Sequence, residues 1–247
     1  MNNVEEEAGQ NKVVTANIDI YERYVQIQTK SSIDAKTIKV LNPKEVVFEG
    51  GRELELDAVS EVPRYYVCNA YGVCGIYSAP GTAVKEAYDT SGIVTNDRGV
   101  TVWLKGNRVS RNQIMAIKEE SVTEQKNSLA VCLDNILRHA GITRNTEYDL
   151  AQGKTATTIL SENMTGVQVL DLSGCTLDAV LYYVNQVIPV LAILEDGEAV
   201  LVTGFNEFNV VIMEPATGKL YKKGMNDATA WFAENGNHFI TYMRTEN

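Results

Sequence analysis

Apolar residues recur at regular intervals along much of the chain, and the clearest helical pattern lies near its middle. Between residues 125 and 142 they are three or four positions apart, which places them on one face of about three helical turns: Leu129, Cys132, Leu133, Ile136, Leu137 and Ala140. Asn127 or Ser128 can cap the start, and Gly141 is typical of a helix C-terminus. We therefore predict a buried helix that opens with a small polar residue.

Downstream of this helix the pattern changes to shorter elements. It predicts helices over residues 155–164, from Ser173 or Thr176 onward, and over residues 225–234. It predicts strands over residues 187–194, 199–204, 210–213, 219–222 and 239–243. Helices followed by an antiparallel meander are typical of the α+β class, so we predict a central helix packed on an antiparallel sheet.

The N-terminal half alternates apolar and polar residues, which is the period of strands. Residues 13–24, 25–30, 37–41, 45–48 and 54–56 are predicted to form a β-rich region. Between residues 64 and 108, two hairpins flank a helix that begins at Pro80. This part is predicted to be a ββαββ unit.

The predicted organisation has four parts. Residues 1–11 are polar and acidic and are expected to be a disordered tail without the features of a signal peptide. Residues 12–62 form the β-rich region, residues 63–112 the ββαββ module, and residues 121–247 the α+β domain. Residues 109–126 contain no glycine or proline, which indicates an ordered connector.

Composition excludes several classes of function. The formal charge of −10 argues against a nucleic-acid partner, because phosphate contacts need clustered Lys and Arg. The longest apolar run, residues 187–194, is too short to span a membrane. His139 and His238 are the two histidines, and there is no glycine-rich phosphate loop or zinc spacing, so we predict no metal site and no cofactor. The pattern does not set an oligomeric state.

Two of the four cysteines flank a predicted turn. Cys68 and Cys74 can face each other across the first hairpin, close enough for a disulfide. The alternative is a pair of free, half-buried thiols. Both interpretations stay open at the level of sequence.

Residues 121–247 carry short motifs in a fixed order. They are Gln125, the helix end at Gly141-Ile142, the strand end at Thr203-Gly204-Phe205, and Glu214-Pro215 with Gly218 after it. This order resembles the papain-like cysteine peptidases that process bacteriocin leader peptides, the double-glycine peptidase-like family, and their relatives on bacterial surfaces. The resemblance implies a papain-like domain. The ββαββ unit, with its segments YYV, GIY, AVKEA, GIVTNDRG and VWLKGNR, resembles a module of uncharacterised Firmicutes surface proteins.

The same resemblance locates the catalytic positions of the family. Counting back from Gly141 places Ser128 where the family has its nucleophilic Cys. Counting back from the Thr-Gly pair places Ala199 where the family has its His, and the family's Asp becomes Glu214. Two of the three catalytic groups are therefore replaced, and the third is longer by one methylene.

Elementary chemistry makes these replacements decisive. A helix N-terminus and a neighbouring imidazolium lower the pKa of a thiol, whereas a serine hydroxyl must give its proton to a positioned base. Ala199 offers no base. Gln125 can still donate to an oxyanion, but that donor alone leaves only residual catalysis. The resemblance therefore implies a degenerate peptidase domain.

A rival interpretation makes Cys132 the nucleophile with His238 as its base. Cys132 lies one turn into the helix, about 6 Å from the family's thiol position, among apolar neighbours typical of a core thiol. His139 lies about 10 Å farther along the same helix and cannot bond to it. His238 comes from the last strand, which does not supply the base in the family. Cys175 is flanked by polar residues and could be reactive, although no base is seen near it.

Two functions are consistent with these residues. The first is a non-catalytic papain-like protein, secreted to the bacterial cell surface, that binds a peptide or protein partner. The second is an active cysteine peptidase that uses Cys132 and His238. A purely structural module of a larger surface protein is a third and plainer alternative, and a cytoplasmic location is the alternative to the surface.

Overall fold

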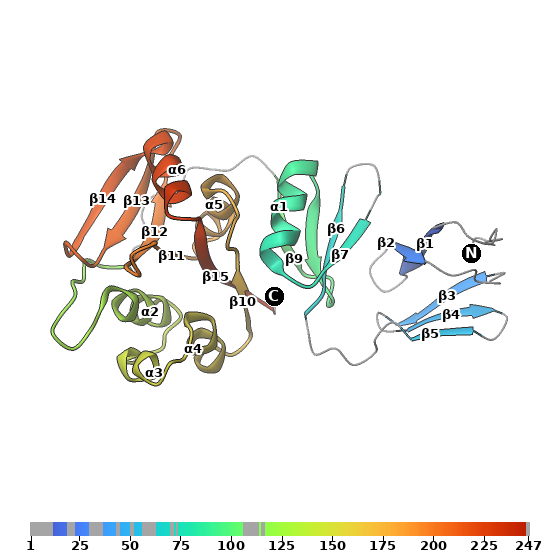
Figure 1. Cartoon of the computed structure of the whole chain (residues 1–247), viewed down its shortest axis with the longest axis horizontal. Coiled ribbons are helices and arrows are strands. Elements are labelled where there is room, and N and C mark those ends of the chain that lie inside the picture. Colours follow the sequence, from blue (N-terminus) through green and yellow to red (C-terminus); the bar gives the residue numbers. More distant parts are fainter. Residues whose placement is uncertain are drawn as a thin grey trace. The chain divides into compact units, whose positions relative to one another are not determined.

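The computed structural model describes residues 12–18, 23–29, 37–42, 45–49, 52–55, 63–69, 72, 74–105, 114 and 117–245, the first five ranges by their backbone only. The predicted tail, residues 1–11, lies outside them. The chain divides into two compact units, Met1–Ala79 with Glu86–Lys105 and Pro80–Lys85 with Gly106–Asn247, which we describe one at a time (Figure 1). The predicted domain boundaries stay predictions.

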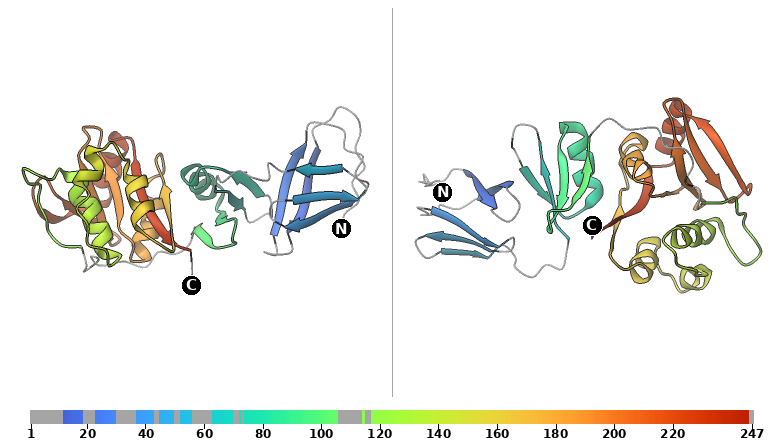
Figure 2. Two further views of the ribbon diagram at one scale, coloured as in Figure 1. Left: turned by 90° about the horizontal axis from the view of Figure 1, so that it is seen from below. Right: turned by 180° about the vertical axis from the view of Figure 1, so that it is seen from behind.

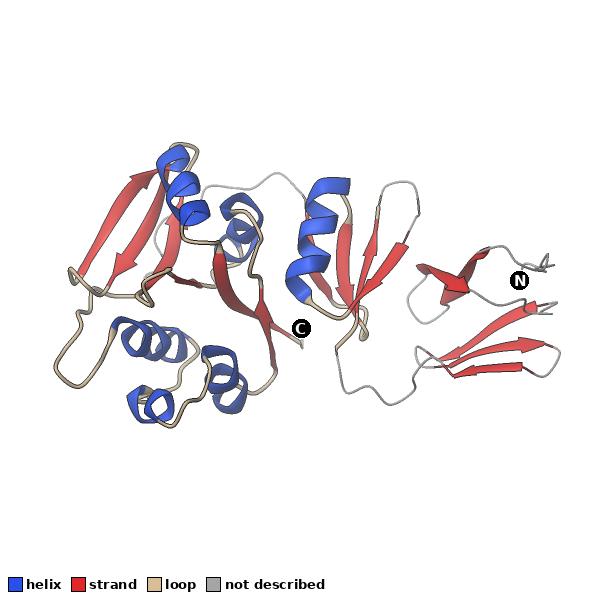
Figure 3. Cartoon of the chain, viewed as in Figure 1, coloured by secondary structure: helices blue, strands red, loops and turns tan. Residues whose placement is uncertain are grey.

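The first unit is built mainly from strands (Figure 3). Strands β1 (Lys12–Ile18) and β2 (Arg23–Thr29) pair with each other, and β3 (Thr37–Asn42), β4 (Glu45–Glu49) and β5 (Arg52–Glu55) form a second antiparallel sheet. The predicted β-rich N-terminal region is therefore confirmed.

The predicted ββαββ unit is also present. It consists of β6 (Tyr65–Cys68), β7 (Cys74–Tyr77), α1 (Pro80–Thr90), β8 (Ile93–Asn96) and β9 (Thr101–Leu104), and its sheet order is β7-β6-β8-β9. Helix α1 begins at Pro80, as predicted, and Ser91 takes the left-handed conformation at its end, with φ of 55°. At the next residue, Gly92, an added Cβ would lie 3.0 Å from the carbonyl oxygen of Cys68.

The second unit is a six-stranded antiparallel sheet covered by helices. The strands are β10 (Val167–Asp171), β11 (Val190–Ile193), β12 (Ala199–Phe205), β13 (Asn209–Glu214), β14 (Lys219–Gly224) and β15 (His238–Arg244). The helices are α2 (Ser128–His139), α3 (Glu147–Ala151), α4 (Ala156–Asn163), α5 (Leu177–Asn185) and α6 (Met225–Glu234). Helices α2 and α4 pack on one face of the sheet, and α5 and α6 lie on the other; Figure 2 gives two further views of these layers.

The α+β class, with a central helix packed on an antiparallel sheet, is confirmed. The predicted meander is too simple, because the sheet order is β10-β15-β11-β12-β13-β14 and the last strand lies between β10 and β11. Strand β10 and helix α3 were not predicted. The strand expected at 187–194 begins only at Val190, because α5 ends in a turn that includes Val187. No helix in the described residues is both long and apolar enough to cross a membrane.

Candidate functional site

Helix α2 carries the predicted site, and its ends form as the sequence indicates. The side chain of Asn127 accepts a hydrogen bond from the backbone amide of Ala130 at 2.8 Å, which caps the N-terminus. At the other end Gly141 has φ of 84°, and the amide of Ile142 donates to the carbonyl of Leu137 at 2.8 Å. This is the hydrogen-bond pattern of a Schellman motif. Residues next to the helix in the sequence therefore determine where it begins and where it ends.

Ser128 and Ala199 are in direct contact. The backbone amide of Ala199 donates to the Ser128 hydroxyl oxygen at 2.9 Å, and the two residues are only 2% and 1% exposed. Ala199 is the first residue of β12, and the hairpin bond from the Leu194 amide to the Glu198 carbonyl directs the next amide away from β11. The two positions that the motif order assigned to the nucleophile and the base thus meet, although 71 residues separate them.

Glu214 lies on the strand next to Ala199. It is the last residue of β13, and its carboxylate accepts hydrogen bonds from the hydroxyls of Thr217, at 2.7 Å, and Tyr221, at 3.4 Å. Burial, together with the charge of Glu214 and this bond, raises the pKa of Tyr221 to about 12. The Glu214 carboxylate is therefore engaged with its own hairpin and makes no hydrogen bond to Ser128 or Ala199 in the described structure.

Gln125 lies apart from these residues. It is exposed in the short turn that Thr123 and Lys126 close with two backbone hydrogen bonds of 3.0 and 3.3 Å. Its own amide donates to the Thr123 hydroxyl at 3.2 Å. Of the four predicted positions, the structure joins Ser128 and Ala199, sets Glu214 on the neighbouring strand and leaves Gln125 at the surface.

The free cysteines are both buried. Cys132 is fully buried in the core, and burial first, then the charges of Glu120 and Glu198, raises its pKa well above the ordinary value. Cys175 donates its thiol proton to the carbonyl of Gly81 at 3.3 Å, within the second unit, and burial raises its pKa to about 12. The structure does not favour the expected reactivity of Cys175, because its thiol is buried and burial raises its pKa.

The two histidines do not complete a catalytic pair. His139 places Nε2 at 2.8 Å from the carbonyl oxygen of Val187. His238, the first residue of β15, is exposed, and its ring folds back so that Nε2 lies 2.8 Å from where a Cβ on Gly236 would be. Within residues 117–245 neither imidazole hydrogen-bonds a thiol or the Ser128 hydroxyl. The same described residues contain no cluster of His, Cys, Asp and Glu suited to a metal ion.

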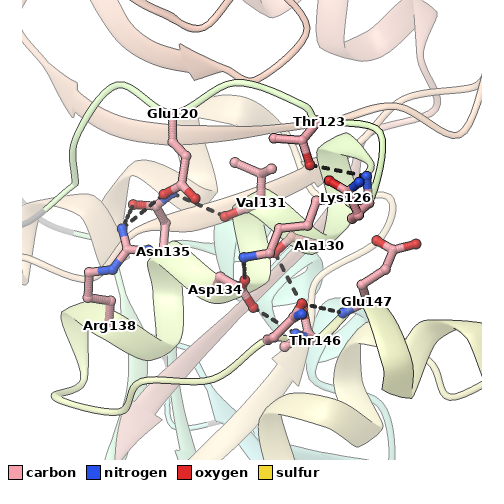
Figure 4. A network of polar contacts seen from close by, with 12 residues as sticks. Glu120, Thr123, Lys126, Ala130, Val131, Asp134, Asn135, Arg138, Thr146 and Glu147 are labelled. Carbon is pink, nitrogen blue, oxygen red and sulfur yellow. Dashed lines mark hydrogen bonds and ion pairs between the residues drawn. The ribbon is translucent and has the colours of Figure 1, made fainter.

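Sequence reasoning missed a buried polar network on α2 (Figure 4). Asp134 is 1% exposed, and its two oxygens accept hydrogen bonds from the Lys126 ammonium at 2.5 Å and the Thr146 amide at 2.9 Å. Beside it on the helix, Asn135 and Arg138 both donate to the carboxylate of Glu120, at 3.1 and 3.0 Å. A usable signal was the pair Asp134-Asn135 inside an otherwise apolar helix, since buried polar groups need partners.

In the first unit, Cys68 and Cys74 pair directly across β6 and β7. Their Cα atoms are 4.1 Å apart, and the structure joins them in a disulfide. Of the two interpretations left open by the sequence, this arrangement corresponds to the cross-hairpin bridge.

Comparisons with known proteins identify a solved structure that is similar to this chain. No protein-family model and no curated protein matches the sequence. A crystal structure from Bacillus anthracis, described as a candidate C39-like peptidase, is similar over 57% of this chain and 100% of its own, with a TM-score of 0.47 and 13% identity. Because this similarity is low, we infer the function from the contacts of Ser128 and Ala199 instead.

Proposed function

We propose that this chain is a non-catalytic papain-like protein of the bacterial cell surface that binds a peptide or protein partner. The observation that carries the proposal is the contact between the Ser128 hydroxyl and the Ala199 amide. Motif order alone assigned these two residues to the nucleophile and the base. Their contact supports that assignment, and a serine beside an alanine lacks the groups that a cysteine peptidase reaction needs.

A papain-like reaction needs a thiolate and an imidazole side by side. At Ser128 the hydroxyl is an acceptor for a backbone amide, is 2% exposed, and has a methyl group where the base would be. A hydroxyl without a base is a poor nucleophile, because its proton has no acceptor during attack. A methyl group cannot supply that acceptor, so the pair has no route to an acyl-enzyme.

The alternative thiol, Cys132, does not offer a second route to catalysis. Cys132 is fully buried in the apolar core, with its pKa raised chiefly by burial, and His238 faces solvent on β15. Nucleophile and base must lie within hydrogen-bond reach of each other for general-base catalysis. The geometry does not favour a peptidase that uses Cys132 and His238.

The first test is a direct search for hydrolysis. The purified chain is incubated with a mixed peptide library, and cleavage is followed by mass spectrometry, with and without an iodoacetamide-type reagent. We expect no cleavage above buffer. Thiol-sensitive hydrolysis that is lost in Cys132→Ser and His238→Ala would overturn the proposal.

The second test restores the family's residues. Ser128→Cys with Ala199→His returns a thiol and an imidazole to positions already in contact, and Ser128→Cys alone is the matched control. We expect faster, pH-dependent alkylation of residue 128 in the double variant than in the control. If Ala199→His disturbs the buried strand, seen as a lowered melting temperature, the search for hydrolysis by the unaltered chain still decides the proposal.

The partner is tested separately by immobilising the chain and measuring binding to extended peptides of varied charge. Saturable binding that competes with an unlabelled peptide supports the proposal. Absence of binding to the whole set would favour a purely structural module instead.

A further inference from the structure

The segment from Lys118 to Asn127 runs between the sheet and α2 and is tied to both. We refer to residues 118–127 as the strap. Two consecutive glutamates in it face opposite ways: Glu119 accepts a hydrogen bond from the Leu220 amide on β14 at 3.2 Å, while Glu120 accepts from Asn135 and Arg138 on α2. Neighbouring side chains thus connect the helical layer to the edge of the sheet, and Figure 4 shows the contacts of Glu120 with α2.

The strap makes further contacts along its length. The amide of Val122 donates to the carbonyl of Pro215 at 3.1 Å, and a Cβ on Gly218 would lie 2.9 Å from the Cβ of Ser121. The strap therefore lies against the β13–β14 hairpin. At its other end the Lys126 ammonium bonds Asp134, and the amide of Asn127 donates to Glu147 at 3.2 Å.

These contacts involve the elements that adjoin the junction at which Ser128 meets Ala199. The strap ends at Asn127, the residue before Ser128. Pro215 follows Glu214, the last residue of β13, and β13 is the strand beside Ala199. An extended chain that approached Ser128 from this side would therefore meet the strap first.

We propose that residues 118–127 form a strap that holds the Ser128–Ala199 site closed, and that release of the Glu119 and Glu120 contacts opens it to a peptide. The inference rests on the proposed function, in which this site is a binding rather than a catalytic element. Two of the three bonds are suited to release, because the bonds of Glu119 to Leu220 and of Glu120 to Arg138 are exposed and water can replace each partner, whereas Asn135 is buried. Arg138 and Glu120, for example, are 45% and 29% exposed.

Ser128→Cys gives a direct reporter of opening. The native free thiols, Cys132 and Cys175, are buried with raised pKa values, so they contribute little background labelling. The reporter chain is labelled with a disulfide reagent in native buffer, alone and with Glu119→Ala and Glu120→Ala combined. The matched control is Glu124→Ala, which removes one charge from an exposed strap residue.

We expect residue 128 to label slowly in the reporter chain and at least about tenfold faster when both glutamates are replaced, since three hydrogen bonds are lost. Glu124→Ala should leave the rate unchanged. Exchange of the Ala199 amide with deuterium, measured with Ser128 intact, should accelerate in the same variants and needs no cysteine at the site.

Four results would overturn the proposed strap. Two concern the labelling rate of residue 128: the reporter chain labels as fast as an exposed thiol, or the double glutamate variant labels no faster than the reporter chain. In the third, Glu124→Ala accelerates this labelling as much as the double glutamate variant does. In the fourth, Cys132 is labelled in the glutamate variant that lacks the reporter. The last would mean that the whole domain opens. None of these measurements involves a partner or hydrolysis. A negative result would therefore overturn the strap without affecting the proposed non-catalytic function, and detection of hydrolysis would overturn that function without affecting these measurements.

Discussion

Two of the polar side chains that helix α2 buries, Ser128 and Asp134, are held in different ways. Ser128 is neutral and accepts one hydrogen bond from the Ala199 amide, whereas Asp134 is a carboxylate whose two oxygens are bonded to Lys126 and Thr146. Burying a charge without partners costs far more than burying a hydroxyl. The first turn therefore buries one neutral group with one hydrogen bond, while the second turn ties the helix electrostatically to its neighbours.

The largest effect is expected from Asp134→Ala. This change leaves the Thr146 amide buried without its acceptor and removes the partner of Lys126, so the free energy of unfolding should fall by about 3 kcal/mol. Chemical denaturation with a fitted midpoint and slope measures it. Arg138→Ala, which breaks an exposed ion pair on the same helix, should cost less than about 1 kcal/mol. Equal losses in the two variants would mean that Asp134 is not an electrostatic tie.

Ser128→Ala should have a smaller effect. It removes the acceptor of one buried amide, and we expect a loss of about 1–2 kcal/mol in the free energy of unfolding, with faster deuterium exchange at Ala199. Ser161→Ala, an exposed serine on α4, is the matched control and should be close to neutral. A neutral Ser128→Ala would show that the hydroxyl does not hold α2 to the sheet.

The limits of α2 are set by residues beside it in the sequence, which is why they could be predicted. Asn127 caps the start and Gly141 takes the left-handed conformation at the end, and both signals act within one turn. The order of the motifs singled out Ser128 and Ala199, which the structure brings into contact. The Asp134 network was not predicted, because Lys126 and Thr146 give no local sign of where they fold, and β10 was missed because its pairing with β15 joins distant segments.

Helices α2 and α5 end in the same hydrogen-bond pattern but with different residues in the left-handed position. Both ends form Schellman motifs, but α5 has Val187 with φ of 63° where α2 has Gly141. A left-handed β-branched residue is strained, so Val187→Gly should stabilise the domain by about 1 kcal/mol. Gly141→Ala should destabilise it by about the same amount, because an added Cβ meets no atom within 4 Å and only the backbone changes. Thermal unfolding of both variants decides whether the strain at Val187 is real.

The smallest effect concerns a second buried carboxylate, Asp149, whose hydrogen bonds to Arg144 and Lys154 lower its pKa. A carboxyl group whose pKa is lower in the folded state stabilises that state above its unfolded pKa of about 4, and this contribution is lost as the pH falls through the folded value. Asp149→Asn should therefore lower stability at neutral pH and narrow the gap to wild type below about pH 4. The effect should be smaller than at Asp134, because the cations of Asp149 are 44% and 34% exposed and water screens both pairs. The unfolding midpoints of wild type and Asp149→Asn, measured between neutral and acidic pH, test this prediction. A difference in midpoint that increased on acidification would mean that the ion pairs of Asp149 do not stabilise the folded state.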